Sequence, residues 1–145
     1  MTTPPNDDDA GTSMTEPSSP AIIAVVDDDE RILDSLRILL ESADYVTRLF
    51  ASGTALLENG HLADIDCLIS DIDLPMMDGF ELLRVVREIR PELPIILVTG
   101  YPEMLNRLPP PGPSHYRLFK KPFNGHELLA SVSDAVGKSK HGGRP

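Results

Sequence analysis

Four short, largely apolar runs in this sequence lead into polar residues of the types that bind metal ions and phosphoryl groups. The runs cover residues 21–26, 67–70, 94–98 and 116–119, and the polar residues after them are Asp27 and Asp28, Asp71, Thr99, and Lys121. A lone aspartate after a strand is usually a loop residue or a helix cap, and each of the others has an equally ordinary explanation. Their occurrence at the ends of four separate runs is the reason to consider a common site.

Three carboxylates that come close together repel one another, and a cation between them removes the repulsion. The available ligands are all hard oxygens, so Mg²⁺ suits them and zinc does not. An ammonium and a hydroxyl beside a metal-bound carboxylate can hold the oxygens of a phosphoryl group. One carboxylate must then be the covalent nucleophile. The combination predicts a site of Mg²⁺-dependent phosphoryl transfer.

The elements that must position these residues alternate between strand and helix. The four runs and a fifth segment, 45–50, are predicted strands, and helices are predicted after them, including 53–58 and 80–90. Such alternation is typical of a parallel sheet with helices on both faces and right-handed crossovers. The carboxyl ends of parallel strands lie at one edge of the sheet, where open α/β sheets bind their ligands.

Helical spacing of apolar residues predicts which side of each helix is buried. The expected inward residues are Ile32, Leu33, Leu36, Leu39 and Leu40 in the first helix, Leu82, Leu83, Val86 and Ile89 in the third, and Leu128, Leu129, Val132, Ala135 and Val136 in the last. The last helix is expected to open at Asn124, with Glu127 as its capping-box partner. We expect it to end near Gly137, with a frayed polar tail over 138–145.

The region of the fourth helix departs from the regular pattern. Residues 101–108 have a helical pattern, but the sequence of 109–113 is Pro-Pro-Pro-Gly-Pro. A helix cannot continue through such a run. We therefore expect a shortened fourth helix, followed by a stiff extended segment.

Composition bounds the remaining possibilities. Of 145 residues, 1–20 are rich in Pro, Ser, Thr and Asp and are expected to form a disordered arm, with one domain over 21–137. The net charge of −10 argues against a nucleic-acid partner. Cys67 is the single cysteine and lies in an apolar run, so it is expected in the core, in a reducing cytoplasmic compartment. No run is long enough to span a membrane, and no signal peptide is evident.

Together these motifs resemble the receiver domain of response regulators in two-component signalling (CheY-like). The matching motifs are Val-Val-Asp-Asp at 25–28, Asp71 with Leu-Pro-Met-Met-Asp-Gly at 74–79, Thr-Gly at 99–100 and Lys-Pro-Phe at 121–123. The resemblance covers about residues 21–136. It implies an α/β doubly wound, flavodoxin-like fold with a five-stranded parallel sheet in the order 2-1-3-4-5.

The resemblance also implies a role for each residue of the site. Asp71 would accept a phosphoryl group from a sensor histidine kinase, a histidine phosphotransfer protein or a small acyl phosphate. The implied Mg²⁺ ligands are Asp28, Asp27 (directly or through water), Asp71 and the backbone carbonyl of Asp73. Lys121 would grip the phosphoryl group and Thr99 would hydrogen-bond it. The bond from Lys121 to Pro122 is expected to be cis.

Two positions differ from the family's pattern. Leu118 stands where the family usually has a switch aromatic, and we expect Tyr116 and Phe119, which flank it, on the opposite face of the strand. This substitution and the proline run of 109–113 alter the usual output face. The Asp73 side chain, two residues past the acceptor, is expected to adjust dephosphorylation through its charge or by holding water.

These features favour a stand-alone receiver that is not a separate enzyme and that signals to an unidentified protein target through protein contacts. One alternative is the receiver of a longer transcription factor or hybrid kinase. Another is a pseudo-receiver that binds partners without phosphorylation, against which the complete set of site residues argues. A flavin-binding protein of the same fold would need a phosphate loop after the first strand, where this chain has an acidic pair. The four histidines show no metal-ligand spacing and are given no catalytic role.

Overall fold

The computed structural model describes residues 20–74, 77, 79–100 and 116–142, with the backbone alone at positions 116 and 138–142. Within these ranges the strands are β2 (Ile22–Val26), β3 (Val46–Phe50), β4 (Cys67–Asp71), β5 (Ile95–Thr99) and β6 (Tyr116–Lys120). The helices are α1 (Glu30–Ser42), α2 (Gly53–Asn59), α3 (Gly79–Ile89) and α4 (Gly125–Gly142), with a 3-10 turn η1 (Leu62–Asp64) before β4.

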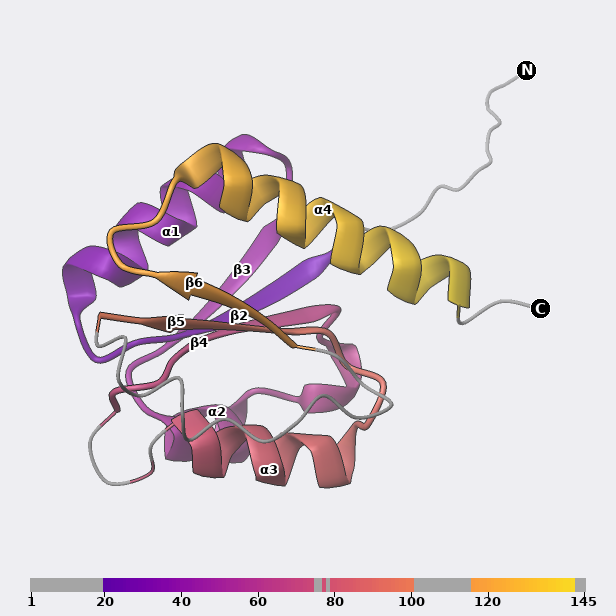
Figure 1. Cartoon of the computed structure of the whole chain (residues 1–145). Helices are drawn as coiled ribbons and strands as arrows, with labels where there is room; N and C mark the ends of the chain where they lie inside the picture. The colour runs from indigo at the N-terminus through magenta and orange to yellow at the C-terminus, as the bar shows by residue number, and fades with distance from the viewer. Residues whose placement is uncertain (1–19, 75–76, 78, 101–115, 143–145) are drawn as a thin grey trace, which may run out of the picture.

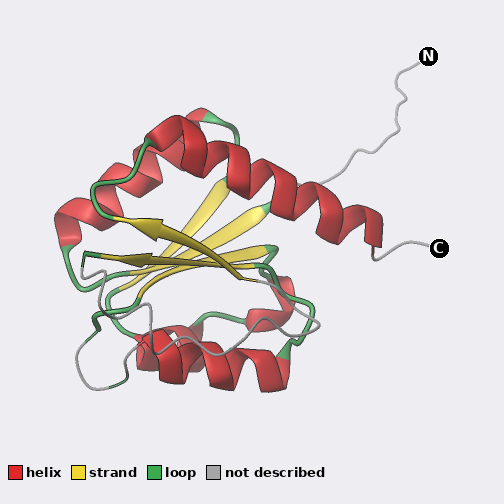
Figure 2. Cartoon of the chain, in the orientation of Figure 1, coloured by secondary structure: helices red, strands yellow, loops and turns green. Residues whose placement is uncertain are grey.

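The strands form one parallel sheet in the order β3-β2-β4-β5-β6, which confirms the predicted order 2-1-3-4-5. Helices α1 and α4 cover one face of the sheet, and α2 and α3 cover the other (Figures 1 and 2). The order of the strands reverses at β2 and β4, where the chain leaves the sheet toward opposite sides. In doubly wound sheets this point, at the carboxyl ends of the strands, is where ligands bind.

The two faces of the sheet carry separate hydrophobic clusters. Alternate residues of one strand enter alternate clusters: Ile23 and Val25 contact the α1 and α4 side, whereas Ala24 and Val26 contact the α2 and α3 side. A strand that is buried on both faces must be apolar throughout, which explains the unbroken apolar runs of the sequence. Each fully buried aliphatic side chain contributes about 1.5–3 kcal/mol relative to an exposed one.

Three helices begin on a side chain that accepts a hydrogen bond from the first turn. Asp29 Oδ1 accepts from Arg31 N at 2.9 Å before α1, and Ser52 Oγ accepts from Ala55 N at 3.0 Å before α2. Asn124 Oδ1 accepts from Glu127 N at 3.1 Å before α4, in agreement with the predicted start of the last helix. These bonds satisfy amide groups that have no partner within the helix.

One predicted inward residue, Ile89, is wrong: its side chain is 56% exposed. Leu82, Leu83 and Val86 are buried as predicted, and Arg90, directly after α3, has only 19% of its side chain exposed. Arg90 Nη1 donates to Leu62 O at 2.6 Å and to Ile65 O at 2.8 Å, and so fixes the end of α3 to the loop before β4. The predicted apolar stripe ended at Ile89, one residue before Arg90, whose side chain covers this end of the core.

We expected the last helix to end near Gly137, but it continues to Gly142. Glycine in the interior of a helix costs about 1 kcal/mol relative to alanine, which weakens a helix without stopping it. The predicted inward stripe of α4 is otherwise found, with Leu128, Val132 and Val136 buried.

Strand β6 presents its neighbouring side chains to opposite faces. Leu118 joins the cluster under α2 and α3, and Phe119 joins the cluster under α1 and α4, as expected for this pair. The expected face of the Tyr116 side chain stays a prediction, because at position 116 the structure describes only the backbone.

Two expectations concern residues outside the described part of the chain: the disordered arm, at 1–19, and the shortened fourth helix with its proline run, at 101–115. Among the described helices, none combines the length and the apolar character needed to cross a bilayer.

Candidate functional site

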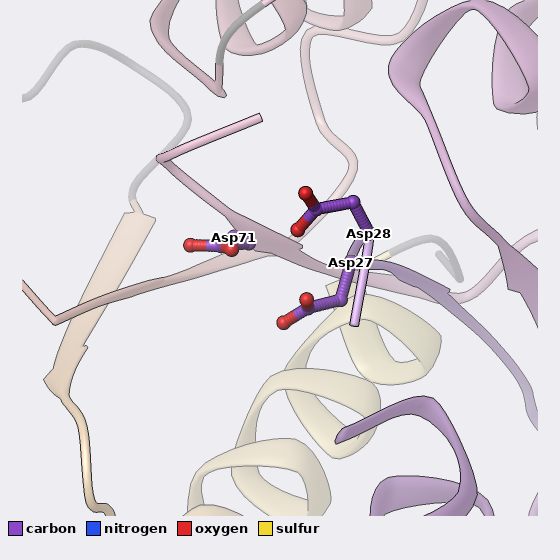
Figure 3. Close-up of side chains that lie close together, drawn as sticks. All are labelled: Asp27, Asp28 and Asp71. Carbon is purple, nitrogen blue, oxygen red and sulfur yellow. The ribbon is translucent and has the colours of Figure 1, made fainter. Parts of the chain in front are cut away.

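The predicted site residues meet at the carboxyl edge of the sheet. Asp27 and Asp28 follow β2, Asp71 ends β4, Thr99 ends β5, and Lys121 follows β6. Figure 3 shows the carboxylates of Asp27, Asp28 and Asp71 reaching into the same space from two neighbouring strands. The reversal of strand order between β2 and β4 thus brings together residues that are far apart in the sequence.

One oxygen from each of these three carboxylates lies within 4.8 Å of the other two. Asp27 and Asp71 are almost fully buried, at 3% and 4% exposed, whereas Asp28 is exposed to solvent. The site therefore has an acidic floor and one acidic group at its solvent side.

Lys121 balances the charge of the two buried carboxylates. Its Nζ lies 3.2 Å from Asp71 Oδ2 and 3.3 Å from Asp27 Oδ2. Burial lowers the pKa of Lys121, but the charges of Asp71 and Asp27 outweigh burial and leave the pKa above its usual value. The lysine is therefore an ammonium ion at neutral pH, placed against the predicted acceptor oxygen.

The pKa of Asp27 is raised above its usual value. Burial is the largest cause and the charge of Asp71 adds to it, while the Asp29 amide and Lys121 act in the opposite direction. Asp29 N donates to Asp27 Oδ1 at 2.9 Å. These contacts fix the orientation of Asp27, with one oxygen on the backbone and the other on Lys121.

Asp73 connects the acceptor to the threonine of the neighbouring strand. Its amide donates to Asp71 Oδ1 at 3.1 Å, and the Thr99 hydroxyl donates to Asp73 Oδ2 at 3.3 Å. Burial, and then the charge of Asp71, raise the pKa of the Asp73 carboxyl group. The sequence placed Asp73 two residues past the acceptor but gave no sign of its bond with Thr99, which depends on how β4 and β5 lie side by side.

Gly79 allows the start of α3 to approach the end of β4. Its amide donates to Ile72 O at 2.9 Å. A Cβ atom at this position would lie 2.6 Å from Ile72 Cα and 2.7 Å from Asp71 O, too close for any residue with a side chain. The glycine is therefore needed to set the backbone on which the acceptor stands.

The loop after β6 is fixed by the backbone. Lys121 N donates to Thr99 O at 2.7 Å, so the lysine and the threonine are held on adjoining strands. The peptide bond between Lys121 and Pro122 is cis, as expected.

The donor set fits Mg²⁺. All three clustered groups are carboxylates, whose hard oxygens are the ligands that Mg²⁺ prefers, and one oxygen of each lies within 4.8 Å of the other two. Their mutual repulsion gives the cation an electrostatic reason to bind. Among the described residues this is the cluster of acidic, cysteine or histidine side chains that could hold a metal ion.

Comparison with known proteins agrees with this geometry. A sequence profile of the response regulator receiver domain matches residues 23–133. Response regulator protein TmoT of Ectopseudomonas mendocina is 32% identical over 117 residues, which are 80% of this chain and 53% of TmoT. The crystal structure of a CheY-like receiver domain protein from Methanospirillum hungatei JF-1 aligns with a TM-score of 0.71 and 31% identity, over 86% of this chain and 100% of that one.

A further relative is DNA-binding transcriptional regulator NtrC of Proteus hauseri, which is 30% identical in an alignment that covers 79% of this chain and 29% of NtrC. The chain thus spans about half the length of TmoT and under a third of NtrC. The expectation of no nucleic-acid partner is not supported, because a relative is named as DNA-binding and the charge argument applies only to the surface of this chain. The profile match and the strand-end residues agree, and the chain belongs to the response regulator receiver domain family of two-component systems.

Proposed function

We propose that this receiver takes a phosphoryl group onto Asp71 from the phosphohistidine of a sensor kinase or phosphotransfer protein, in a Mg²⁺-dependent reaction in the cytoplasm, and signals through protein contacts. The observation that carries the proposal is the position of Lys121, whose ammonium lies 3.2 Å from Asp71 Oδ2 inside a cluster of three carboxylates. A buried carboxylate with a cationic partner and further carboxylates beside it has the groups that phosphoryl transfer to a carboxylate oxygen requires.

In the proposed reaction, a carboxylate oxygen of Asp71 forms a bond to phosphorus while the bond from phosphorus to the donor histidine nitrogen breaks. The nitrogen keeps the electron pair and takes up a proton. Lys121 neutralises charge on the phosphoryl oxygens, and the Thr99 hydroxyl donates a hydrogen bond to one of them. The product is an aspartyl phosphate, so the chain acts as a phospho-accepting signalling domain that promotes its own phosphorylation and dephosphorylation.

The residues that would hold Mg²⁺ are the Asp27, Asp28 and Asp71 carboxylates and the backbone carbonyl of Asp73. When bound, the ion supplies positive charge that stabilises the developing charge on the phosphoryl oxygens. Asp28 is the exposed member of this set and meets the solvent, while Asp27 is anchored by Asp29 N and Lys121.

The test is phosphorylation with acetyl phosphate and Mg²⁺, followed by intact mass spectrometry. One added phosphoryl mass is expected in the wild-type chain and none in Asp71→Asn or with EDTA. Lys121→Gln is expected to lower the rate by about 10²-fold or more, since it removes a preorganised charge at the reacting atoms. Lys120→Gln is the matched control, because Lys120 is exposed and its substitution removes the same charge one residue away.

A wild-type chain without an adduct, with acetyl phosphate and with a panel of sensor kinases as donors, would contradict the proposal and favour a receiver-shaped binding module. An adduct that survives Asp71→Asn would contradict the choice of acceptor.

A second form of the proposal places this receiver inside a longer regulator with a DNA-binding output. The observation in its favour is that the chain covers 53% of TmoT and 29% of NtrC, whose printed name is DNA-binding. The mass of the native protein, detected in cell extract with an antibody against this domain, distinguishes the two forms. A band at 15.9 kDa supports the stand-alone receiver, and a larger band supports the longer regulator.

A further inference from the structure

The Thr99 hydroxyl has a hydrogen-bond partner other than the acceptor. Thr99 is fully buried, and its Oγ1 donates to Asp73 Oδ2 at 3.3 Å. A hydroxyl carries a single hydrogen and can donate one full hydrogen bond at a time. While Asp73 accepts that hydrogen, a phosphoryl oxygen at Asp71 cannot.

Asp73 is attached to both parts of the site. Its amide donates to Asp71 Oδ1 at 3.1 Å, so the backbone that carries its carboxylate is tied to the acceptor. Asp71 pairs with Val98 in the sheet, which puts Thr99 one residue beyond the acceptor on the neighbouring strand. Asp73 therefore contacts both the acceptor and the Thr99 hydroxyl, and a change at Asp71 can act on that hydroxyl through Asp73 alone.

We propose that Asp73 is a positioning residue that holds the Thr99 hydroxyl away from the acceptor in the unphosphorylated chain, so that a phosphoryl group on Asp71 must compete with Asp73 for it. This inference rests on the proposed phosphorylation of Asp71. A carboxylate is a stronger acceptor than a neutral oxygen, so the competition is set by the charge of Asp73. The consequence is a bias toward the unphosphorylated arrangement.

Two physical effects of Asp73 must be separated. Its carboxylate holds the hydroxyl, and it also repels a phosphoryl group, which brings a charge of about −1.5 to −2. The first effect needs Thr99 and the second does not. A double-mutant cycle between the two residues therefore isolates the proposed contact.

The experiment measures binding of beryllofluoride, a mimic of the phosphoryl group, at saturating Mg²⁺ by fluorine NMR. Asp73→Asn is expected to lower the Kd about fivefold or more, the low end of couplings between linked groups, and Asp73→Ala at least as much. In a Thr99→Ala background, Asp73→Asn is expected to have a much smaller effect. Thr99→Ser keeps the hydroxyl and is expected to restore the full effect. Asp64→Asn, which removes an exposed charge in η1, is the control and should leave the Kd unchanged.

The same factor for Asp73→Asn in the wild-type and Thr99→Ala backgrounds would overturn the proposal, because repulsion alone would then explain the effect. An unchanged Kd in Asp73→Asn would also overturn it. Failure of the proposed function would give a different result: the wild-type chain would bind no beryllofluoride, with or without Mg²⁺.

A second readout needs no phosphoryl mimic. Three-bond couplings to the Thr99 methyl group report its side-chain rotamer in the unphosphorylated chain. One rotamer is expected in the wild-type chain and a mixture in Asp73→Asn, whereas Asp64→Asn should match the wild type. A single unchanged rotamer in Asp73→Asn would show that Asp73 does not hold the hydroxyl.

Discussion

The carboxyl group of Asp27 is almost wholly removed from water and still ionisable. Burial is the largest reason that its pKa is raised. A raised pKa means that the folded chain binds the proton more tightly than the unfolded chain, so the free energy of unfolding falls as the pH rises from 3.8 through the folded pKa. Above that window the charged group reduces the stability of the metal-free protein.

We therefore predict that Asp27→Asn raises the free energy of unfolding at pH 7 in EDTA, and that the difference disappears below pH 3.8. The substitution leaves Lys121 its second partner, Asp71 Oδ2, which lies 3.2 Å from its Nζ in the wild-type chain. Urea unfolding of both proteins across this pH range is the measurement, with Asp64→Asn as a control for net charge. A wild-type chain that is the more stable at pH 7 would contradict the prediction.

Substitution of glycine by alanine is expected to change the free energy of unfolding in opposite directions at Gly79 and Gly137. Gly79→Ala should destabilise by about 1–3 kcal/mol, because its Cβ would lie 2.6 Å from Ile72 Cα and force the backbone apart under Asp71. Gly137→Ala should stabilise by up to about 1 kcal/mol, since nothing lies within 4 Å and the residue is inside α4. Urea unfolding measures both, and Gly79→Ala should also slow phosphorylation by acetyl phosphate. Equal effects of the two substitutions would show that the close contact at Gly79 has no consequence.

At the scale of elements, the sequence was sufficient where a strand is buried on both faces. The runs that became β2, β4 and β5 are apolar over most of their length because both clusters need them, and they could be recognised without a structure. The polar residues at or directly after the ends of these strands then predicted the site, because parallel strands end at one edge. The fold and the three carboxylates follow from these two facts.

The sequence was not sufficient where a contact joins distant elements through one side chain. Arg90 closes the core where the apolar stripe predicted Ile89, by binding carbonyl groups 25 and 28 residues earlier. The bond between Thr99 and Asp73 joins the end of β5 to the loop after β4, whose separation is set by the pairing of β4 with β5. Neither pairing can be recognised from the neighbouring sequence, because Arg, Thr and Asp also occur often at exposed positions without such a partner.

The position of Cys67 in the middle strand β4 gives a prediction for alkaline pH. Burial, and then the charge of Asp66, raise the pKa of the Cys67 thiol from 9.0 to about 12. The folded chain keeps this proton where the unfolded chain loses it, so stability should fall between pH 9 and pH 12, by up to about 1.4 kcal/mol per pH unit. Cys67→Ala should lower stability at neutral pH but remove this part of the slope.

Lys121 and other groups that titrate in the same range are present in both proteins, so the difference between wild type and Cys67→Ala isolates the thiol. Urea unfolding between about pH 7 and pH 11 is the measurement. Parallel stability curves for the two proteins would show that the thiol is not held protonated in the fold.

At the scale of the whole molecule, the site lies at the ends of strands that contribute to both hydrophobic clusters. Asp27 directly follows β2 and Asp71 ends β4, and the two faces of these strands carry the two clusters. Repulsion among the carboxylates therefore acts on the central strands and not on a peripheral loop. A cation that relieves it should stabilise the folded chain as a unit, because a ligand that binds only the folded state shifts the global unfolding equilibrium.

We predict that Mg²⁺ raises the free energy of unfolding by about 1.4 kcal/mol at a free concentration ten times its Kd. Asp28→Asn should abolish most of this gain while leaving the metal-free protein nearly unchanged, since Asp28 is exposed and makes its contribution through the cation. Asp64→Asn, which removes an equally exposed charge away from the site, should keep the full gain. Thermal unfolding of the three proteins in EDTA and in a Mg²⁺ series is the measurement. If Asp64→Asn lost the gain as Asp28→Asn does, Mg²⁺ would be acting on the net charge of −10, and the three carboxylates would not be its binding site.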